Sequence, residues 1–161
     1  MNEEVKYISY EEVLSVYAKM IDASDGGFDG VRDEGGIRAA LEFVQNDMYY
    51  PNFSDKLCSL VYKFCSGHYF NDGNKRIALT LGAYFLYKNS YFWQATIFMR
   101  QMESIVYHVA ASNIDQDLLL RIMTCFMDGE DYDEELKIDI ANAMSRGELG
   151  VRGEDYDNEF E

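Results

Sequence analysis

His68-Tyr69-Phe70-Asn71-Asp72-Gly73-Asn74-Lys75-Arg76 is followed at once by Ile77-Ala78-Leu79-Thr80-Leu81-Gly82-Ala83-Tyr84-Phe85-Leu86-Tyr87. The first nine residues bring an imidazole, a carboxylate, amides and two cations into one short loop. The next eleven are almost wholly apolar, which is typical of a helix buried on nearly every side. Backbone N–H groups at a helix start point toward a bound anion, and the helix dipole favours negative charge there. The sequence therefore predicts a phosphate-handling loop at the start of a central core helix.

Apolar residues at helical spacing lie on both sides of these two segments. Before them, helices are expected after a capping box at Ser9, from about Asp33 until residues 49–52, and from a Ser54 cap to Gly67. After them, helices are expected over residues 99–111, 117–127 and 134–144, with residues 91–93 as an aromatic connector. The glycine-rich residues 24–30 predict a flexible loop. We find no repeat and no convincing strand, so the expected fold is all-α, a helical bundle around residues 77–87.

Size and composition favour a single soluble domain. The chain has 161 residues, of which 48% are hydrophobic, enough for a real core. Its N-terminus lacks the pattern of a signal peptide. The sequence contains no run of 18 apolar residues, so it predicts no membrane span. The three cysteines form no CxxC pair. They are typical of reduced thiols, so we expect a cytoplasmic protein.

The net charge of −15 is unevenly distributed. Residues 128–161 hold 13 acidic and 3 basic residues, whereas residues 1–127 are only mildly acidic. Direct nucleic-acid binding is disfavoured because phosphate contacts need a basic surface. A basic partner for the acidic end stays open beside the simpler interpretation of a solvated surface. The expected organisation is a domain over 1–127, an additional helix within 128–146 and a disordered acidic tail over 147–161.

Two side chains of the loop carry its chemistry. His68 carries an imidazole, the side-chain type best suited to general-base catalysis near neutral pH, so it is the natural base for a hydroxyl nucleophile; a lone histidine would more often be structural. Asp72 offers a hard oxygen ligand beside a phosphate site, which suits Mg²⁺. Aspartate also favours the N-cap of a helix, and that alternative stays open.

The remaining residues of the loop can bind phosphate. Gly73 lets backbone approach an anion closely, and the Asn74 amide can donate to an oxygen; plain turn chemistry is the alternative for both. Arg76 can grip a phosphate with two parallel N–H bonds, while Lys75 acts as a point charge. Outside such a motif, a Lys-Arg pair would more often be solvated charge on the protein surface. Phe70 is expected to point into the core and anchor the loop.

The string His-x-Phe-x-Asp-Gly-Asn-Lys-Arg resembles the core motif of the Fic/Doc (Fido) family. Lys75 stands where most Fic proteins have glycine, as in the Doc branch, the death-on-curing toxins. An Ile-Ser-x-Glu-Glu start at Ile8, the Gly-Gly-x-x-Gly loop near Phe28, and Phe85-Leu86 with Asn89 also match that branch. The resemblance covers about residues 7–127.

The resemblance implies a Fido helical fold with ATP as co-substrate, Mg²⁺ at Asp72 and catalysis by His68. Lysine at position 75 goes, in Doc proteins, with transfer of the γ-phosphoryl group to a Ser/Thr hydroxyl of a translation elongation factor. Family members with glycine there transfer AMP, which remains an alternative. A non-catalytic binding module is a further alternative, which the intact motif disfavours. The resemblance also implies a protein substrate and a separate antitoxin chain as partners.

Some features depart from the family pattern or match it only superficially. Ser66 stands where Doc sequences can carry arginine, so one phosphate contact is expected to be missing. Thr124-x-x-x-Asp128-Gly129 is the nearest match to the inhibitory Ser/Thr-x-x-x-Glu-Gly/Asn helix, and we interpret it as a helix end. The spacing from Asp22 to Asp33 resembles a calcium loop but lacks its ligands. His108 has no partner motif and is expected to be structural.

Overall fold

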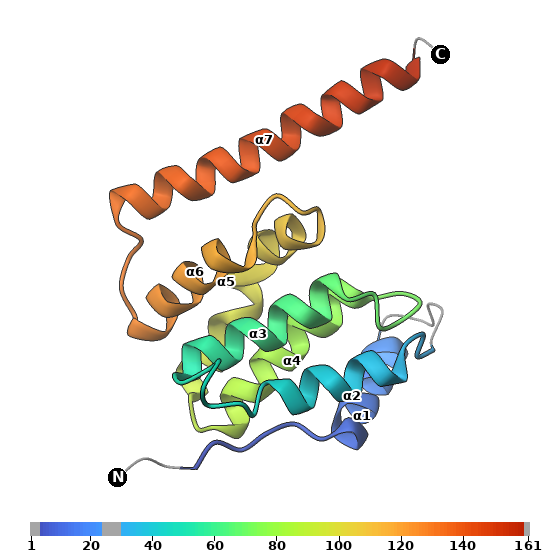
Figure 1. Cartoon of the computed structure of the whole chain (residues 1–161), viewed down its shortest axis with the longest axis vertical. Helices are drawn as coiled ribbons and strands as arrows, with labels where there is room; N and C mark the ends of the chain where they lie inside the picture. The colour runs from blue at the N-terminus through green and yellow to red at the C-terminus, as the bar shows by residue number, and fades with distance from the viewer. Residues whose placement is uncertain (1–3, 24–29, 160–161) are drawn as a thin grey trace.

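A computed structural model of the chain describes residues 4–23 and 30–159, with side chains as far as residue 147. Figure 1 shows an assembly of helices in chain order: α1 (Tyr10–Ala23), α2 (Glu34–Phe43), α3 (Phe53–Ser66), α4 (Asn74–Lys88), α5 (Phe92–Ala110), α6 (Gln116–Asp128) and α7 (Glu134–Glu159). Within these ranges the only β-type pairing is an isolated antiparallel bridge between Val31 and Phe70. The predicted all-α fold is confirmed.

Helix α4 lies at the centre of the bundle, as its apolar sequence predicts. It packs against α3, α5 and α1. Ile77, Leu81 and Leu86 are fully buried, which agrees with a helix that has almost no polar face. Gly82 permits the close contact with α5, since a Cβ there would lie 2.5 Å from Cε1 of Phe98.

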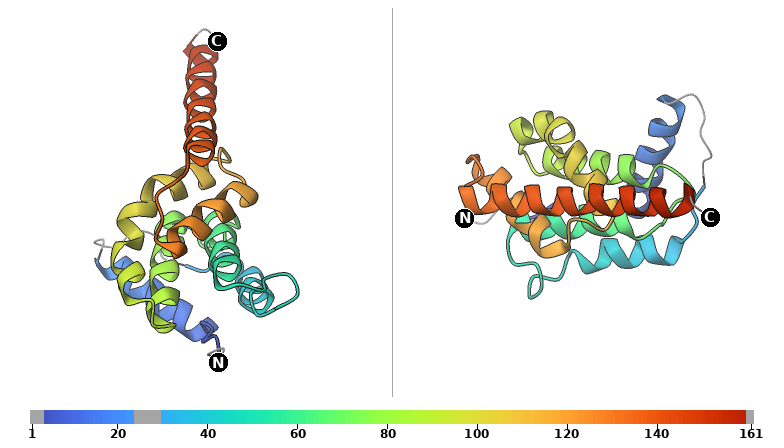
Figure 2. Two further views of the ribbon diagram at one scale, coloured as in Figure 1. Left: turned by 90° about the vertical axis from the view of Figure 1, so that its left-hand side faces the viewer. Right: turned by 90° about the horizontal axis from the view of Figure 1, so that it is seen from above.

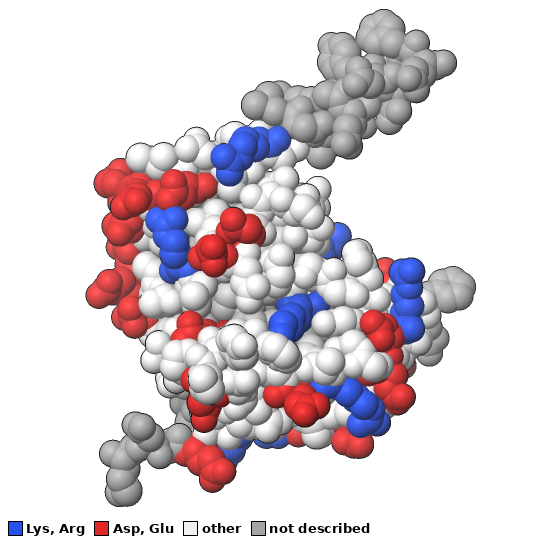
Figure 3. Space-filling view, in the orientation of Figure 1, with Lys and Arg blue, Asp and Glu red and all other residues white. Residues whose placement is uncertain are grey.

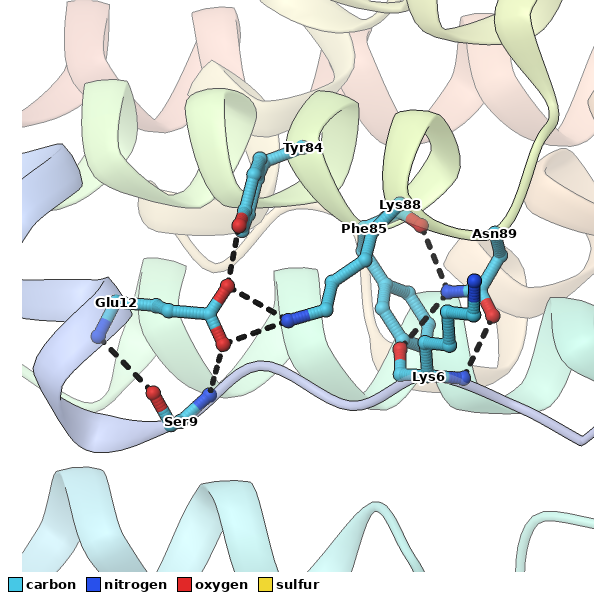
Figure 4. A network of polar contacts seen from close by, with 7 residues as sticks. All are labelled: Lys6, Ser9, Glu12, Tyr84, Phe85, Lys88 and Asn89. Carbon is cyan, nitrogen blue, oxygen red and sulfur yellow. Dashed lines mark hydrogen bonds and ion pairs between the residues drawn. The ribbon is translucent and has the colours of Figure 1, made fainter.

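The N-terminal segment is fastened to the C-terminal end of α4 (Figure 4). Ser9 and Glu12 form the predicted capping box, with Glu12 N–H donating to Ser9 Oγ at 3.1 Å and Ser9 N–H donating to Glu12 Oε1 at 3.2 Å. The Glu12 carboxylate also accepts hydrogen bonds from Lys88 Nζ at 2.6 Å and from the Tyr84 hydroxyl. Two segments on opposite sides of the motif in the sequence are thus joined in space.

Three helix boundaries before α6 differ from the sequence expectation. Helix α5 begins at Phe92, so the predicted aromatic connector over residues 91–93 is wrong. Helix α2 ends at Phe43, because the Asn46 side chain accepts hydrogen bonds from the N–H groups of Met48 and Tyr49 and turns the chain. Helix α3 is capped by Asn52 and not by Ser54.

Helix α7 is longer than the sequence predicted. A helix ending by residue 146 and an irregular tail from residue 147 were expected, but the helix continues to Glu159. Its first turns pack through buried Leu136, Ile140 and Ala143, and its far end projects beyond the bundle (Figures 1 and 2). The glycines after residue 146 each disfavour a helix by about 1 kcal/mol. No proline follows Pro51, so none interrupts the helical hydrogen bonds of the backbone.

The surface carries an acidic patch at one end of the bundle (Figure 3). Figure 3 shows acidic side chains gathered where α6 passes into α7. These exposed residues are Asp128, Glu130, Asp131, Asp133, Glu134 and Glu135. Among the described residues, no helix is both long and apolar enough to cross a membrane. The predicted loop over residues 24–29, with most of the calcium-loop pattern, lies outside the described residues.

Candidate active site

A pocket of about 910 Å³ brings the motif loop and the start of α4 opposite one face of α5. All six predicted site residues line this pocket: His68, Asp72, Gly73, Asn74, Lys75 and Arg76. The opposite wall consists of Met99, Arg100, Glu103, Val106, Tyr107 and Ala110, with Met20 and Ile21 of α1 at a further edge. The residues expected to act together therefore do lie together, while their individual roles stay predictions.

The start of α4 has the geometry that an anion site needs. Gly73 is the N-cap with φ +81°, in the left-handed region, and no side chain caps the helix among the described residues. The first-turn N–H groups therefore keep their hydrogen-bonding capacity beside the pocket. A Cβ at Gly73 would lie 3.0 Å from Cε of Met20, so both conformation and space favour glycine.

Phe70 anchors the loop in the core, as predicted. Its side chain is buried, and its ring stacks on the Tyr17 ring at 4.1 Å between centroids. The Tyr17 hydroxyl then donates a hydrogen bond to the Asp72 carbonyl at 3.0 Å. Helix α1 therefore holds the loop immediately before the residues that start α4.

The Asn74 side chain has a structural role that the sequence did not predict. Its Oδ1 accepts the Phe70 N–H at 3.1 Å, and its Nδ2 donates to the Phe70 carbonyl at 3.0 Å. The amide therefore closes the loop with one of its two N–H donors, and donation of the second N–H to a phosphate oxygen stays a prediction. The backbone N–H of Asn74 remains part of the uncapped helix start.

A short pairing next to the loop was not predicted. Arg32 and Asp33 both donate their N–H groups to the Tyr69 carbonyl, at 2.8 and 3.0 Å, and Asn71 N–H donates to the Gly30 carbonyl at 3.1 Å. The residues just before α2 thus run beside the motif loop. No local pattern indicated this pairing, because it joins segments almost forty residues apart.

Asp72 could bind Mg²⁺ only together with other oxygen donors. Its side chain is exposed, and its Oδ1 accepts the Gly73 N–H at 2.8 Å. The described residues contain no group of three or more His, Cys, Asp or Glu side chains that could hold a metal. One carboxylate beside an anion site suits Mg²⁺, which keeps waters and takes its other oxygens from substrate phosphates. The residues present therefore fit Mg²⁺ bound together with a nucleotide.

The cations and the histidine are accessible. His68, Lys75 and Arg76 are all exposed, and neither cation forms an ion pair with the described residues. Their charge is thus available to a ligand. His68 has φ +53°, a left-handed conformation that is uncommon for a residue with a side chain.

Two other side chains close to the loop do not contribute chemistry. Cys65 lines the pocket, but burial raises the pKa of its thiol to about 11, so it stays protonated near neutral pH. Its Sγ–H donates to the Val106 carbonyl at 3.3 Å. The Ser66 hydroxyl donates to the Tyr62 carbonyl within α3 at 2.7 Å. Ser66 therefore does not replace the arginine that Doc sequences can carry there.

Sequence reasoning missed the wall formed by α5. Arg100, Glu103 and Tyr107 repeat at intervals of three and four residues, which places them on one face of the helix. That spacing alone shows a shared face but not that the face lies opposite α4. His108 is outside the pocket lining and lies 3.0 Å from Asn113 Nδ2 through its Nδ1, in line with the structural role expected for it.

Comparisons with known proteins point to one family. The Fic/DOC family model matches residues 7–86. The chain is 34% identical over 88 residues to "Protein kinase doc" of Escherichia phage P1, covering 53% of this chain and 69% of that protein. It is 30% identical over 116 residues to "Toxin Doc" of Mycolicibacterium smegmatis (strain ATCC 700084 / mc(2)155), covering 70% of this chain and 86% of that protein. Both relatives bear the name Doc, so the Doc-like resemblance read from the motif is confirmed. The chain belongs to the Fic/DOC family.

Proposed function

We propose that this protein is a Doc-like toxin that transfers the γ-phosphoryl group of ATP to a Ser or Thr hydroxyl of a target protein. The observation that carries the proposal is the uncapped, glycine-started α4, which presents Lys75 and Arg76 to the same pocket as His68. Phosphoryl transfer needs mainly positioning and stabilisation of charge, and this pocket supplies both kinds of group. The names of the two relatives support a kinase-like toxin.

The chemical step follows from the exposed groups of the loop. His68 accepts the proton of the target hydroxyl while the hydroxyl oxygen forms a bond to the γ-phosphorus. The bond between that phosphorus and the β–γ bridging oxygen breaks, and ADP leaves. The N–H groups of α4, Lys75 and Arg76 stabilise the negative charge on the phosphate oxygens. Mg²⁺, bound through Asp72 and the phosphates, would neutralise further charge.

Labelled ATP separates the proposal from AMP transfer. The protein is incubated with a translation elongation factor and either γ-labelled or α-labelled ATP, with Mg²⁺. Label on the target from the γ position alone supports phosphoryl transfer. Label from the α position means that the enzyme transfers AMP, and it contradicts the kinase proposal.

The two histidines of the chain give a matched control for toxicity. On induced expression, we expect the parent and His108→Ala to arrest growth and His68→Ala to permit it. His108 serves as control because it is outside the pocket lining and contacts the rim residue Tyr107 but none of the motif residues, so its loss leaves the proposed base in place. Arrest by His68→Ala equal to the parent's would show that the protein acts as a binding module. Co-expression of a neighbouring small open reading frame then tests for the separate antitoxin, which should restore growth.

A further inference from the structure

Lys75 has an aromatic partner on the opposite wall of the pocket. Its Nζ lies 5.5 Å from the centroid of the Tyr107 ring, within the range of a cation–π contact. Tyr107 belongs to α5, lines the same pocket and is 55% exposed, so its ring borders the space open to a ligand. Two elements that are more than thirty residues apart in sequence thus meet at this side chain.

Among the described residues, the Tyr107 ring is the group that contacts the Lys75 ammonium. Every ion pair among these residues involves other cations, and Glu103 on the same wall of α5 lies outside ion-pair distance of Lys75. A lysine side chain has a flexible four-carbon stem and occupies many rotamers when nothing holds it. The contact with Tyr107 therefore decides which of those rotamers the ammonium prefers.

Tyr107 is itself held by its neighbours. Its ring packs edge-to-face on His108, at 5.3 Å between centroids and an interplanar angle of 86°. His108 Nδ1 lies 3.0 Å from Asn113 Nδ2, just beyond the end of α5. The ring under Lys75 is thus supported by a contact with the chain that leads to α6.

We infer that Tyr107 is a positioning residue that holds the Lys75 ammonium at the side of the pocket facing α5. This inference rests on the proposed function, in which Lys75 binds the phosphates of ATP. Holding the ammonium in advance reduces the ordering that nucleotide binding requires. A cation–π contact at an exposed site is worth about a two- to fivefold change in affinity.

ATP binding tests the inference through a double-mutant cycle. We expect Tyr107→Leu to weaken ATP binding about two- to fivefold and Tyr107→Phe, which keeps the ring, to bind like the parent. In a Lys75→Met background, Tyr107→Leu should have no further effect. Equal weakening in both backgrounds would show that Tyr107 contacts the nucleotide itself and would overturn the inference. Tyr87→Leu serves as control, because Tyr87 is an exposed tyrosine of α4 that does not line the pocket.

A second measurement needs no nucleotide and so separates this inference from the proposed function. In the NMR spectrum of the free protein, the εCH₂ signal of Lys75 is identified by its loss in Lys75→Met. Ring current from Tyr107 should shift this signal, and Tyr107→Leu should move it while Tyr107→Phe leaves it near its parental position. An unchanged signal in Tyr107→Leu would overturn the inference. If the parent binds no ATP, the proposed function fails, and the NMR comparison alone decides the position of Lys75.

Discussion

The side-chain amide of Asn74 forms hydrogen bonds to both backbone groups of Phe70, at 3.1 Å to its N–H and at 3.0 Å to its carbonyl. This pair closes the turn from the buried Phe70 to Asn74, the first residue of α4. The amide thereby fixes the direction in which Asp72 and Gly73 leave the core. An amide is required because one end must accept and the other must donate.

Replacing Asn74 should loosen the loop. Asn74→Ala removes both hydrogen bonds and leaves two backbone groups of a half-buried loop without partners, so we expect about 1–3 kcal/mol lower stability in urea unfolding. Asn74→Asp has the same shape but sets a carboxylate oxygen against the Phe70 carbonyl, and it should be no more stable than Asn74→Ala. A parent-like unfolding midpoint for Asn74→Ala would contradict the closing role.

Gly73→Ala should impair both stability and nucleotide binding. A left-handed conformation costs a residue with a Cβ about 1–2 kcal/mol, and at φ +81° this Cβ would also lie 3.0 Å from Cε of Met20. Gly129→Ala is the matched control, since Gly129 has φ +69° but a Cβ added there would meet no atom within 4 Å. We expect both variants to lose stability, Gly73→Ala at least as much as Gly129→Ala, and weakened ATP binding for Gly73→Ala alone. Parental ATP affinity in Gly73→Ala would show that the helix start does not contact the phosphates.

Gly82→Ala should destabilise the contact between α4 and α5. Alanine favours a helix over glycine by about 1 kcal/mol, but the new methyl would lie 2.5 Å from Cε1 of Phe98 and 3.0 Å from Cγ2 of Val61. Overpacking of this kind costs about 1–3 kcal/mol, so the net change in thermal unfolding should be a loss. Gly35→Ala in α2, whose Cβ would meet only Asp33 Oδ1 at 3.7 Å, should be neutral or stabilising. A gain in stability for Gly82→Ala would mean that α5 readily moves away.

Stability should fall in acid through Glu12. Burial opposes ionisation of Glu12, but hydrogen bonds from Lys88 and Tyr84 outweigh it and lower the pKa from 4.5 to about 2. Because the folded pKa lies below the unfolded one, this stabilisation is present above pH 4.5 and is lost as the pH falls toward 2. Glu12→Gln should therefore lower stability at pH 7 and flatten the dependence between pH 5 and 2 in urea titrations. An unchanged slope in Glu12→Gln would assign the acid sensitivity to other carboxylates.

His68→Gly and His68→Ala should separate backbone strain from chemistry. His68 has φ +53°, which glycine adopts freely and alanine does not. We expect both variants to lose transfer activity, with His68→Gly more stable than His68→Ala by about 1 kcal/mol. Equal stability of the two variants would show that the loop relaxes once the imidazole is gone.

Much of the fold and the site could be predicted because the deciding signals are local. The core helix is recognised by its continuous apolar residues, and the capping box at Ser9 by its spacing. The six site residues stand within nine positions, so any structure that folds this loop at the start of α4 brings them together. The boundary at Phe92 and the continuation of α7 were not predictable in the same way. Aromatic residues and glycines lower local helix propensity, and the surrounding structure decides the outcome.

The amino-acid sequence by itself determined the central helix, the motif loop before it and the family to which the chain belongs. Only the tertiary structure decided that the Asn74 amide binds Phe70, that residues 30–33 pair with the loop, and that Tyr107 lies beside Lys75. The reason is physical: spacing along one segment specifies which side chains share a face or a turn. Which face meets another depends on how all the helices pack at once, as the close approach of Gly82 to Phe98 illustrates.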